Sequence, residues 1–227
     1  MLRYSLPMLF SLISTNIVAD LSPEQLEIWF NNDKLDMPEE AAVQDEVLRF
    51  ILKTKKKNIP VTEKTYRINI DSLKTGWVII EQCYRNLDPV SKLEVLYEYR
   101  KMRKLEITHQ HLVEKLWIEG QTVQMENLSK GAAVCTKAEV KILRHADTNK
   151  YLLLAGPFKR KFLDGYYPMQ VKLKIHYPAR QLALDEMFPE SAPGFHVTKA
   201  NGSITISSIF TGKLYLALSF KALNSIK

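Results

Sequence analysis

The sequence predicts a mainly β protein, an antiparallel β-sandwich or a partly open β-barrel, preceded by a short α-helical segment. Apolar and polar residues alternate in successive short runs from residue 61 onward, which is typical of antiparallel sheets with one solvated side. Turn signals separate these runs at close intervals, and helical periodicity is confined to the first 60 residues. We therefore expect a signal peptide over 1–19, a helical N-terminal segment over 20–60 and a β-sandwich domain over 61–227.

The first 19 residues have the features of a secretory signal. Arg3 precedes an apolar run over 6–13, and a small, polar stretch ends at Ala19, so cleavage is expected before Asp20. A membrane anchor is the alternative, but this run is well short of the roughly 20 residues that span a bilayer. No later apolar run reaches that length, so the mature chain is expected to have no transmembrane segment and to be periplasmic or secreted.

Two helix starts follow the expected cleavage site. Ser22 and Gln25 are spaced as a capping box, with a proline at the first helical position between them. Asp36 begins a second amphipathic stretch that ends in a lysine-rich run over 53–57. Lysines complement the carboxyl end of a helix, so we assign this run to helix termination, with an anion-binding patch as the alternative.

After Pro60 the apolar period changes from that of a helix to that of a strand. The runs with strand character lie at 65–71, 76–83, 92–100, 105–119, 121–126, 132–143, 151–156, 169–177, 197–206 and 212–220. In the run 92–100, Leu93, Val95, Tyr97 and Tyr99 share one face. Asn201-Gly202 is the strongest hairpin signal in the chain.

Cys83 and Cys135 are the two cysteines of the sequence. An even number of cysteines in an exported chain favours a disulfide, and two separate buried thiols are the alternative. Neither cysteine lies in a recognisable redox or protease motif, so a catalytic role is not expected.

Composition and motifs argue against several classes of function. The chain has a formal charge of +7, which allows anionic partners without requiring them. An exported protein meets lipid headgroups, glycans and acidic proteins rather than nucleic acid. The sequence contains no Gly-x-Ser-x-Gly elbow, no His-Glu-x-x-His motif and no glycine-rich phosphate loop. We expect no cofactor and more likely a binding protein than an enzyme.

His109 and His111 are the one candidate metal pair. Two positions apart on a strand, both side chains would point to the same face. Glu106 and Glu114 would lie on the opposite face of an unbroken strand, so no third ligand is evident. We therefore predict exposed polar residues and leave a metal site as the alternative.

The segment 158–167 is the strongest candidate binding surface. Three consecutive cations lie between two phenylalanines, and a pair of tyrosines follows a turn at Asp164-Gly165. Cations of this kind often protect an edge strand. The alternative is a surface that binds an anionic or amphiphilic partner, since arginine and aromatic residues are enriched at contacts. Its candidate residues are Phe158, Lys159, Arg160, Lys161, Phe162, Tyr166 and Tyr167, and a second cluster at Lys101, Arg103 and Lys104 could join them.

These observations predict a non-catalytic binding or assembly module of the cell-envelope space. Its expected partner is an envelope protein or an anionic lipid or glycan. A carbohydrate-binding or carbohydrate-cleaving sandwich is one alternative, for which Trp77 and Trp117 would line a cleft. A carrier of an apolar small molecule is another, and it would contain an unfilled cavity between the sheets. The sequence does not set the oligomeric state.

Overall fold

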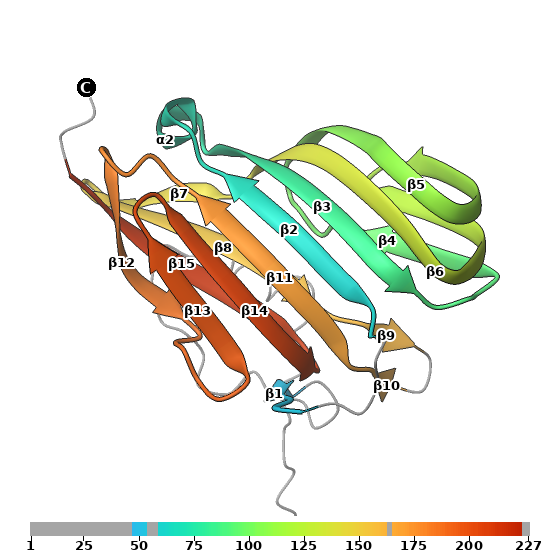
Figure 1. Cartoon of the computed structure of the whole chain (residues 1–227). Coiled ribbons are helices and arrows are strands. Elements are labelled where there is room, and N and C mark those ends of the chain that lie inside the picture. The colour runs from blue at the N-terminus through green and yellow to red at the C-terminus, as the bar shows by residue number, and fades with distance from the viewer. Residues whose placement is uncertain (1–46, 54–58, 163–164, 224–227) are drawn as a thin grey trace, which may run out of the picture.

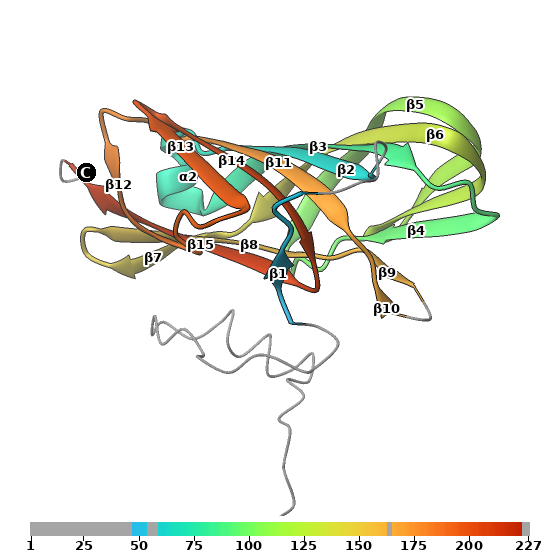
Figure 2. The same ribbon diagram turned by 60° about the horizontal axis from the view of Figure 1, so that its bottom comes forward.

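The protein is mainly β and consists of two open sheets that lie face to face. The computed structural model describes residues 47–53, 59–162 and 165–223. Figure 2 shows the sheets as two layers, with β2, β11 and β14 in one and β8, β15 and β12 in the other. The predicted sandwich is thus confirmed, and neither sheet closes into a barrel. Among the described residues, no helix is long and apolar enough to cross a membrane.

The larger sheet has nine strands in the order β1-β14-β11-β2-β3-β6-β4, with β13 beside β14 and β5 beside β6 (Figure 1). The smaller sheet has the order β12-β15-β8-β7, and β9 and β10 form a separate two-stranded ribbon. The strands of the larger sheet are β1 (Arg49–Phe50), β2 (Val61–Arg67), β3 (Trp77–Leu87), β4 (Lys92–Leu96), β5 (Met102–Glu119), β6 (Thr122–Lys141), β11 (Met169–His176), β13 (Phe195–Ala200) and β14 (Ser203–Thr211). The others are β7 (Leu143–Asp147), β8 (Lys150–Phe158), β9 (Lys161–Phe162), β10 (Gly165–Tyr166), β12 (Leu182–Phe188) and β15 (Leu214–Ala222).

The core lies between the two layers and follows the predicted alternation. Leu173 on β11 and Ile206 on β14 are buried from the larger sheet, and Leu153, Leu218 and Phe220 are buried from the smaller one. On β11 the intervening lysines are exposed. Burial of apolar area on this scale is the main favourable term in folding.

One pair of strands corrects the expectation of a purely antiparallel sheet. Strands β2 and β11 pair in parallel, with Val61 opposite Gln170 and Arg67 opposite His176. Parallel neighbours need a long crossover, and here the chain between them forms β3 to β10. Local alternation carries no information about such a distant pairing, so the larger sheet is mixed.

A short helix interrupts a run that the sequence analysis assigned to a strand. Strand β2 ends at Arg67, and α2 spans Ile70–Thr75. Asn69 caps it, because its side chain accepts a hydrogen bond from the Ser72 amide and the Ser72 hydroxyl accepts one from the Asn69 amide. This capping box is a local signal that outweighs the alternation of Ile68 and Ile70.

The helix predicted from Asp36 to residue 57 does not extend through residues 47–53. There Arg49–Phe50 form β1, antiparallel to β14, and the Phe50 ring lies 5.1 Å from the Phe195 ring. Pairing with the edge of the larger sheet and the contact between the two phenylalanine rings stabilise a strand here, although the sequence has helical periodicity. Residues 20–46, with the first predicted helix, lie outside the described part of the chain, as does the predicted signal peptide over 1–19.

Strand β6 is bent and pairs with different strands of the larger sheet along its length. Its second half pairs with β3, whereas its first half pairs with β4. Between these halves the pairing of β6 with β5 shifts in register. His111 on β5 lies opposite Ala133, but Val113, two residues later, lies opposite Leu128, so β6 has extra residues that form a bulge. A bulge bends its strand, and Gly131 supports the bend with a positive φ of 85°. Figure 2 shows the result, because β4 lies on the same side of the larger sheet as β8.

The predicted disulfide joins Cys83 on β3 to Cys135 on β6. The two residues are directly opposed in the antiparallel ladder, with their Cα atoms 4.0 Å apart and 52 residues apart in sequence. The bond therefore fixes the register of β3 and β6 and encloses β4, β5 and the bend of β6 in one covalent loop.

We expect removal of this disulfide to lower the free energy of unfolding by on the order of 4 kcal/mol, from the loop entropy that the bond removes from the unfolded chain. Urea unfolding of the Cys83→Ser/Cys135→Ser variant, measured beside the oxidised wild type, tests this. Equal unfolding midpoints would contradict it.

Candidate functional site

A cavity of about 310 Å³ lies where β4 and the segment after it cover one end of the larger sheet. Strands β2 and β3 form its floor and residues 93–99 form one wall. Residues 156–161, the end of β8 and the segment after it, form another wall. The volume is at the lower end of the range of small-molecule sites, roughly 300–1,000 Å³.

The floor of the cavity is polar although it continues the apolar face of the sheet. Thr62, Lys64 and Tyr66 alternate on the buried side of β2. Gln82 and Tyr84 on β3 lie opposite Lys64 and Thr62 in the ladder. All of these except Tyr66 line the cavity. The inner face of the sheet thus changes from aliphatic to hydrogen-bonding where the smaller sheet ends.

Lys64 is the central residue of this floor. Its side chain is almost completely buried, with 6% of the residue exposed. Its Nζ atom donates a hydrogen bond of 2.7 Å to the Tyr99 hydroxyl. The centroids of the Tyr66, Tyr99 and Phe158 rings lie 5.4, 5.2 and 5.7 Å from Nζ. Ring faces at such distances attract a cation, but they replace only part of its hydration.

No carboxylate of the described residues pairs with the Lys64 ammonium. Burial lowers the pKa of Lys64 from 10.5 to about 7, because the charged form loses its hydration and gains no counter-ion. Near neutral pH, Lys64 is therefore neutral in some of the molecules and charged in the others. A perturbed lysine in a cleft is a recognised mark of a functional site.

Neutral hydroxyl groups surround this amine. Burial raises the pKa of Tyr97 to about 12 and raises the pKa values of Tyr66, Tyr84 and Tyr99 as well. The Tyr97 hydroxyl is hydrogen-bonded to Thr136 on β6. These groups remain protonated at any physiological pH, so Lys64 is the group of the floor that changes charge near pH 7.

The Gln82 side chain adds an acceptor that has no partner. Its amide nitrogen donates to the Tyr84 hydroxyl, and its Oε1 atom is buried without a hydrogen bond in the described part of the chain. A buried acceptor without a partner costs free energy. A ligand hydroxyl or a trapped water would satisfy it.

Two ion pairs flank the mouth of the cavity. Lys159 Nζ lies 2.8 Å from Glu98 Oε1. Arg160 pairs with Asp88 and also donates to the Pro168 carbonyl at 3.1 Å. These contacts hold the segment after β8 against the residues that flank β4. The Arg160 side chain is 16% exposed, whereas those of Lys159 and Glu98 are 33% and 38% exposed.

The predicted binding segment forms a cavity wall rather than a separate surface. Phe158 is buried, and it lines the cavity together with Lys159, Arg160 and Lys161. Tyr166 and Tyr167 lie outside the lining, where the Lys161 and Arg160 head groups each lie 5.4 Å from one ring centroid. Phe162 belongs to β9, and its side chain is not among those described.

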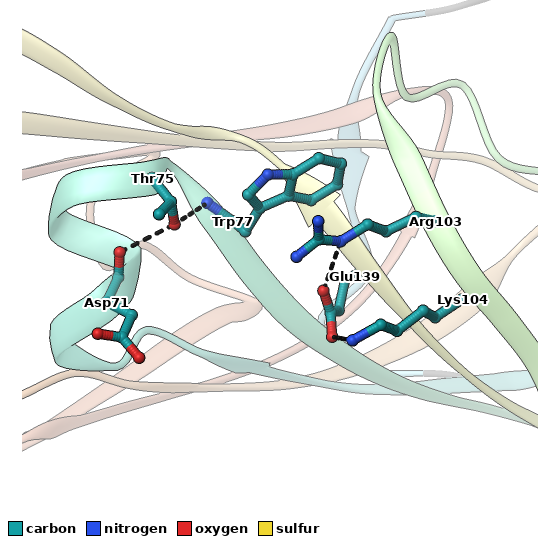
Figure 3. A network of polar contacts seen from close by, with 6 residues as sticks. All are labelled: Asp71, Thr75, Trp77, Arg103, Lys104 and Glu139. Atoms are coloured by element: carbon teal, nitrogen blue, oxygen red, sulfur yellow. Dashed lines mark hydrogen bonds and ion pairs between the residues drawn. The ribbon is translucent and has the colours of Figure 1, made fainter.

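The second cationic cluster lies elsewhere. Figure 3 shows Arg103 and Lys104 converging on Glu139 of β6, each at 2.7 Å, with the Arg103 guanidinium 4.1 Å from the centre of the Trp77 ring. Trp77 begins β3, whereas the cavity is at the other end of that strand. Arg103 and Lys104 therefore do not join the segment after β8.

The carbohydrate and metal alternatives gain no support from this arrangement. Neither Trp77 nor Trp117 lines the cavity, so no tryptophan-lined cleft forms there. His109 and His111 are exposed on β5. The described residues contain no group of three or more histidine, cysteine or carboxylate side chains that could hold a metal.

Sequence reasoning missed Lys64, Thr62, Gln82 and Tyr84. The sequence contains a signal for them, because Thr62 and Lys64 lie four and two residues before Tyr66 and therefore share its face of β2. Lys64 is thus a charge on the apolar face of the strand, and this position is the signal that indicates the site. Tyr97 and Tyr99 were placed on the correct face, but their approach to β2 depends on the bend of β6.

Comparisons with known proteins do not identify the chain. No family and no curated protein matches it. Three similar solved structures are variants of M1 zinc metallopeptidase. One, from Deinococcus radiodurans with a Tyr-Ser-Ala substrate, has a TM-score of 0.37 and 11% identity. A two-domain form with L-tryptophan has values of 0.35 and 11%, and a further D. radiodurans structure has values of 0.35 and 12%.

Each match covers 72% of this chain and 42% of the peptidase chain. The chain thus corresponds to less than half of the length of these enzymes. TM-scores at this level carry no argument about function.

The Lys64→Met variant should be more stable than the wild type at neutral pH, by an amount that decreases as the pH rises. The unfolded chain keeps this proton up to about pH 10, whereas the folded chain releases it above about pH 7, so wild-type stability rises between these values. We expect the difference between the two proteins to shrink by on the order of 3 kcal/mol from about pH 6.5 to about pH 9.5.

Urea unfolding of both proteins across this range measures the difference. Lys174→Met, on the exposed side of the neighbouring strand β11, is the matched control and should show no such pH dependence. Parallel stability curves for wild type and Lys64→Met would contradict the interpretation.

Proposed function

We propose that this protein is a non-catalytic binding protein of an oxidising, extracytoplasmic compartment, and that it holds a small amphiphilic molecule in the cavity. The ligand's apolar part would pack against the aliphatic and aromatic wall, and its oxygen-bearing end would meet Lys64. This proposal combines the anionic or amphiphilic partner and the carrier of a small molecule expected from the sequence.

The observation that carries the proposal is a buried ammonium without a counter-ion in a cavity. Burying a charge without a partner is costly, and among the described residues the contacts of the Lys64 ammonium are one hydroxyl acceptor and three ring faces. A carboxylate or carbonyl oxygen at Nζ would supply the missing partner. Charge-assisted hydrogen bonds in a low-dielectric site are among the strongest polar contacts.

The wall of the cavity suits a short hydrocarbon chain. Leu87, Val90, Val95, Phe158 and Met169 contribute apolar surface around the polar floor. Many ligand sites have this composition, a mostly apolar lining with a few convergent polar groups. The arrangement therefore favours a molecule with one polar end over a sugar or a peptide.

The disulfide supports the proposed location. Disulfides persist in oxidising compartments and are rare in the cytosol, and Cys83–Cys135 is formed in the fold. A periplasmic or secreted protein, as the signal-like N-terminus predicts, satisfies this condition.

Octanoate should bind the wild-type protein, and the Lys64→Met variant should bind it at least about tenfold more weakly, since one charge-assisted hydrogen bond is lost. Isothermal titration calorimetry at neutral pH measures both affinities. Lys174→Met should bind like the wild type. Equal affinity of wild type and Lys64→Met, or no binding to either, would contradict the proposal.

The carboxylates at the mouth should oppose an anionic ligand. We expect the Asp88→Asn/Glu98→Gln variant to bind octanoate more tightly, because the substitutions remove the two negative charges paired with Lys159 and Arg160, and these cations then attract the incoming anion more strongly. Uncharged 1-octanol is the control and should bind both proteins equally. A variant with weaker octanoate binding would show that the ion pairs shape the entrance instead.

A further inference from the structure

We infer that Lys64 is a covalent attachment site, whose Nζ atom condenses reversibly with an apolar aldehyde in the cavity to form an imine. The inference rests on the proposed function, because the aldehyde must first occupy the same cavity. It adds the chemical class of the ligand and a bond between ligand and protein.

The position of the amine is the first observation. Lys64 Nζ is held on the polar floor of the cavity, 2.7 Å from the Tyr99 hydroxyl, and apolar residues of the wall face this floor. A ligand whose chain fills the cavity would bring its terminal carbonyl carbon against this nitrogen. Holding two reacting groups in one small space greatly raises their effective concentration.

The surroundings also keep the amine reactive. Only the neutral amine attacks a carbonyl, and desolvation in an apolar pocket is a recognised way to activate a lysine. Asp88, Glu94 and Glu98 line the cavity, but no ion pair joins any of them to Lys64 among the described residues, and Asp88 and Glu98 pair with Arg160 and Lys159. With its pKa lowered to about 7 by burial, about half of Lys64 is neutral at pH 7, against less than about one in a thousand for an ordinary lysine.

The reaction needs no oxidant, reductant or cofactor. The Nζ lone pair forms a bond to the carbonyl carbon, the carbonyl π pair moves to oxygen, and one of the two amine protons is transferred to that oxygen. The carbon–oxygen bond of this carbinolamine then breaks, the second amine proton leaves with the hydroxyl group as water, and the nitrogen lone pair completes the C=N bond.

Tyr99 is placed to carry the proton between nitrogen and oxygen. Its hydroxyl contacts Nζ and stays protonated, because burial raises the pKa of Tyr99 above its usual range. It can accept a proton from nitrogen while it donates its own to the carbinolamine oxygen. When the imine is protonated, the rings of Tyr66, Tyr99 and Phe158 would stabilise the cation as they do the ammonium.

The experiment uses the oxidised full chain, octanal and sodium cyanoborohydride at pH 7, which reduces an imine to a stable secondary amine. Peptide mass spectrometry then reports which lysines carry an octyl group and how fast it is acquired. We expect Lys64 to be alkylated at least about tenfold faster than exposed Lys174, and 1-octanol to slow alkylation of Lys64 but not of Lys174. Tyr99→Phe should slow alkylation of Lys64 by about tenfold or more.

The controls separate this inference from the proposed function. Lys64→Arg keeps a cation but forms no imine, so it should lose the fast alkylation while Lys174 reacts as before. If octanoate binds the wild type and Lys64 reacts no faster than Lys174, the imine inference is overturned and the proposed function stands. If octanoate does not bind and Lys64 shows no preference, both are overturned.

Discussion

The structure depends on the pairing of β6 with two different strands. One half of β6 pairs with β3, and the other half pairs with β4. Both partners belong to the larger sheet. The strand bends between Leu128 and Ala133, and Figure 2 shows the result, because β4 lies on the side of β2 and β3 where β8 also lies. Tyr97 and Tyr99 follow β4 directly, so the same bend sets them over β2. Without it, the floor around Lys64 would face solvent, and the cavity would have no wall on that side.

Lys64 shows how stability and binding place opposite demands on one position. An apolar side chain there would extend the core that Ile80 and Leu173 already form beside it, and it would remove an expensive charge. Under the proposed function, the lysine gives up this stability for an amine whose counter-ion is the ligand. Natural proteins commonly retain such costs at functional sites. The tyrosine hydroxyls around Lys64 reduce the cost without neutralising the charge.

Sequence reasoning succeeded where the signal was local. The alternation over Met169 to Ile175, the Asn201-Gly202 hairpin and the Cys83–Cys135 pair all follow from patterns within a few residues or from a count. It failed where distant segments meet. The parallel pairing of β2 with β11 and the bend of β6 are set by packing between layers. The site shares this origin, because its residues come from β2, β3, the segment after β4 and the segment after β8.

The position of the disulfide has a consequence for how the cavity could be opened. Residues 84–134 lie between the bonded cysteines, and they include the wall formed by β4 and the tyrosines that follow it. A protease that cut this loop once would leave both pieces joined through sulfur, with the new chain ends free to separate. Only reduction would release them. The wall over Lys64 could therefore be nicked, widening the entrance, while the protein remained one covalent molecule.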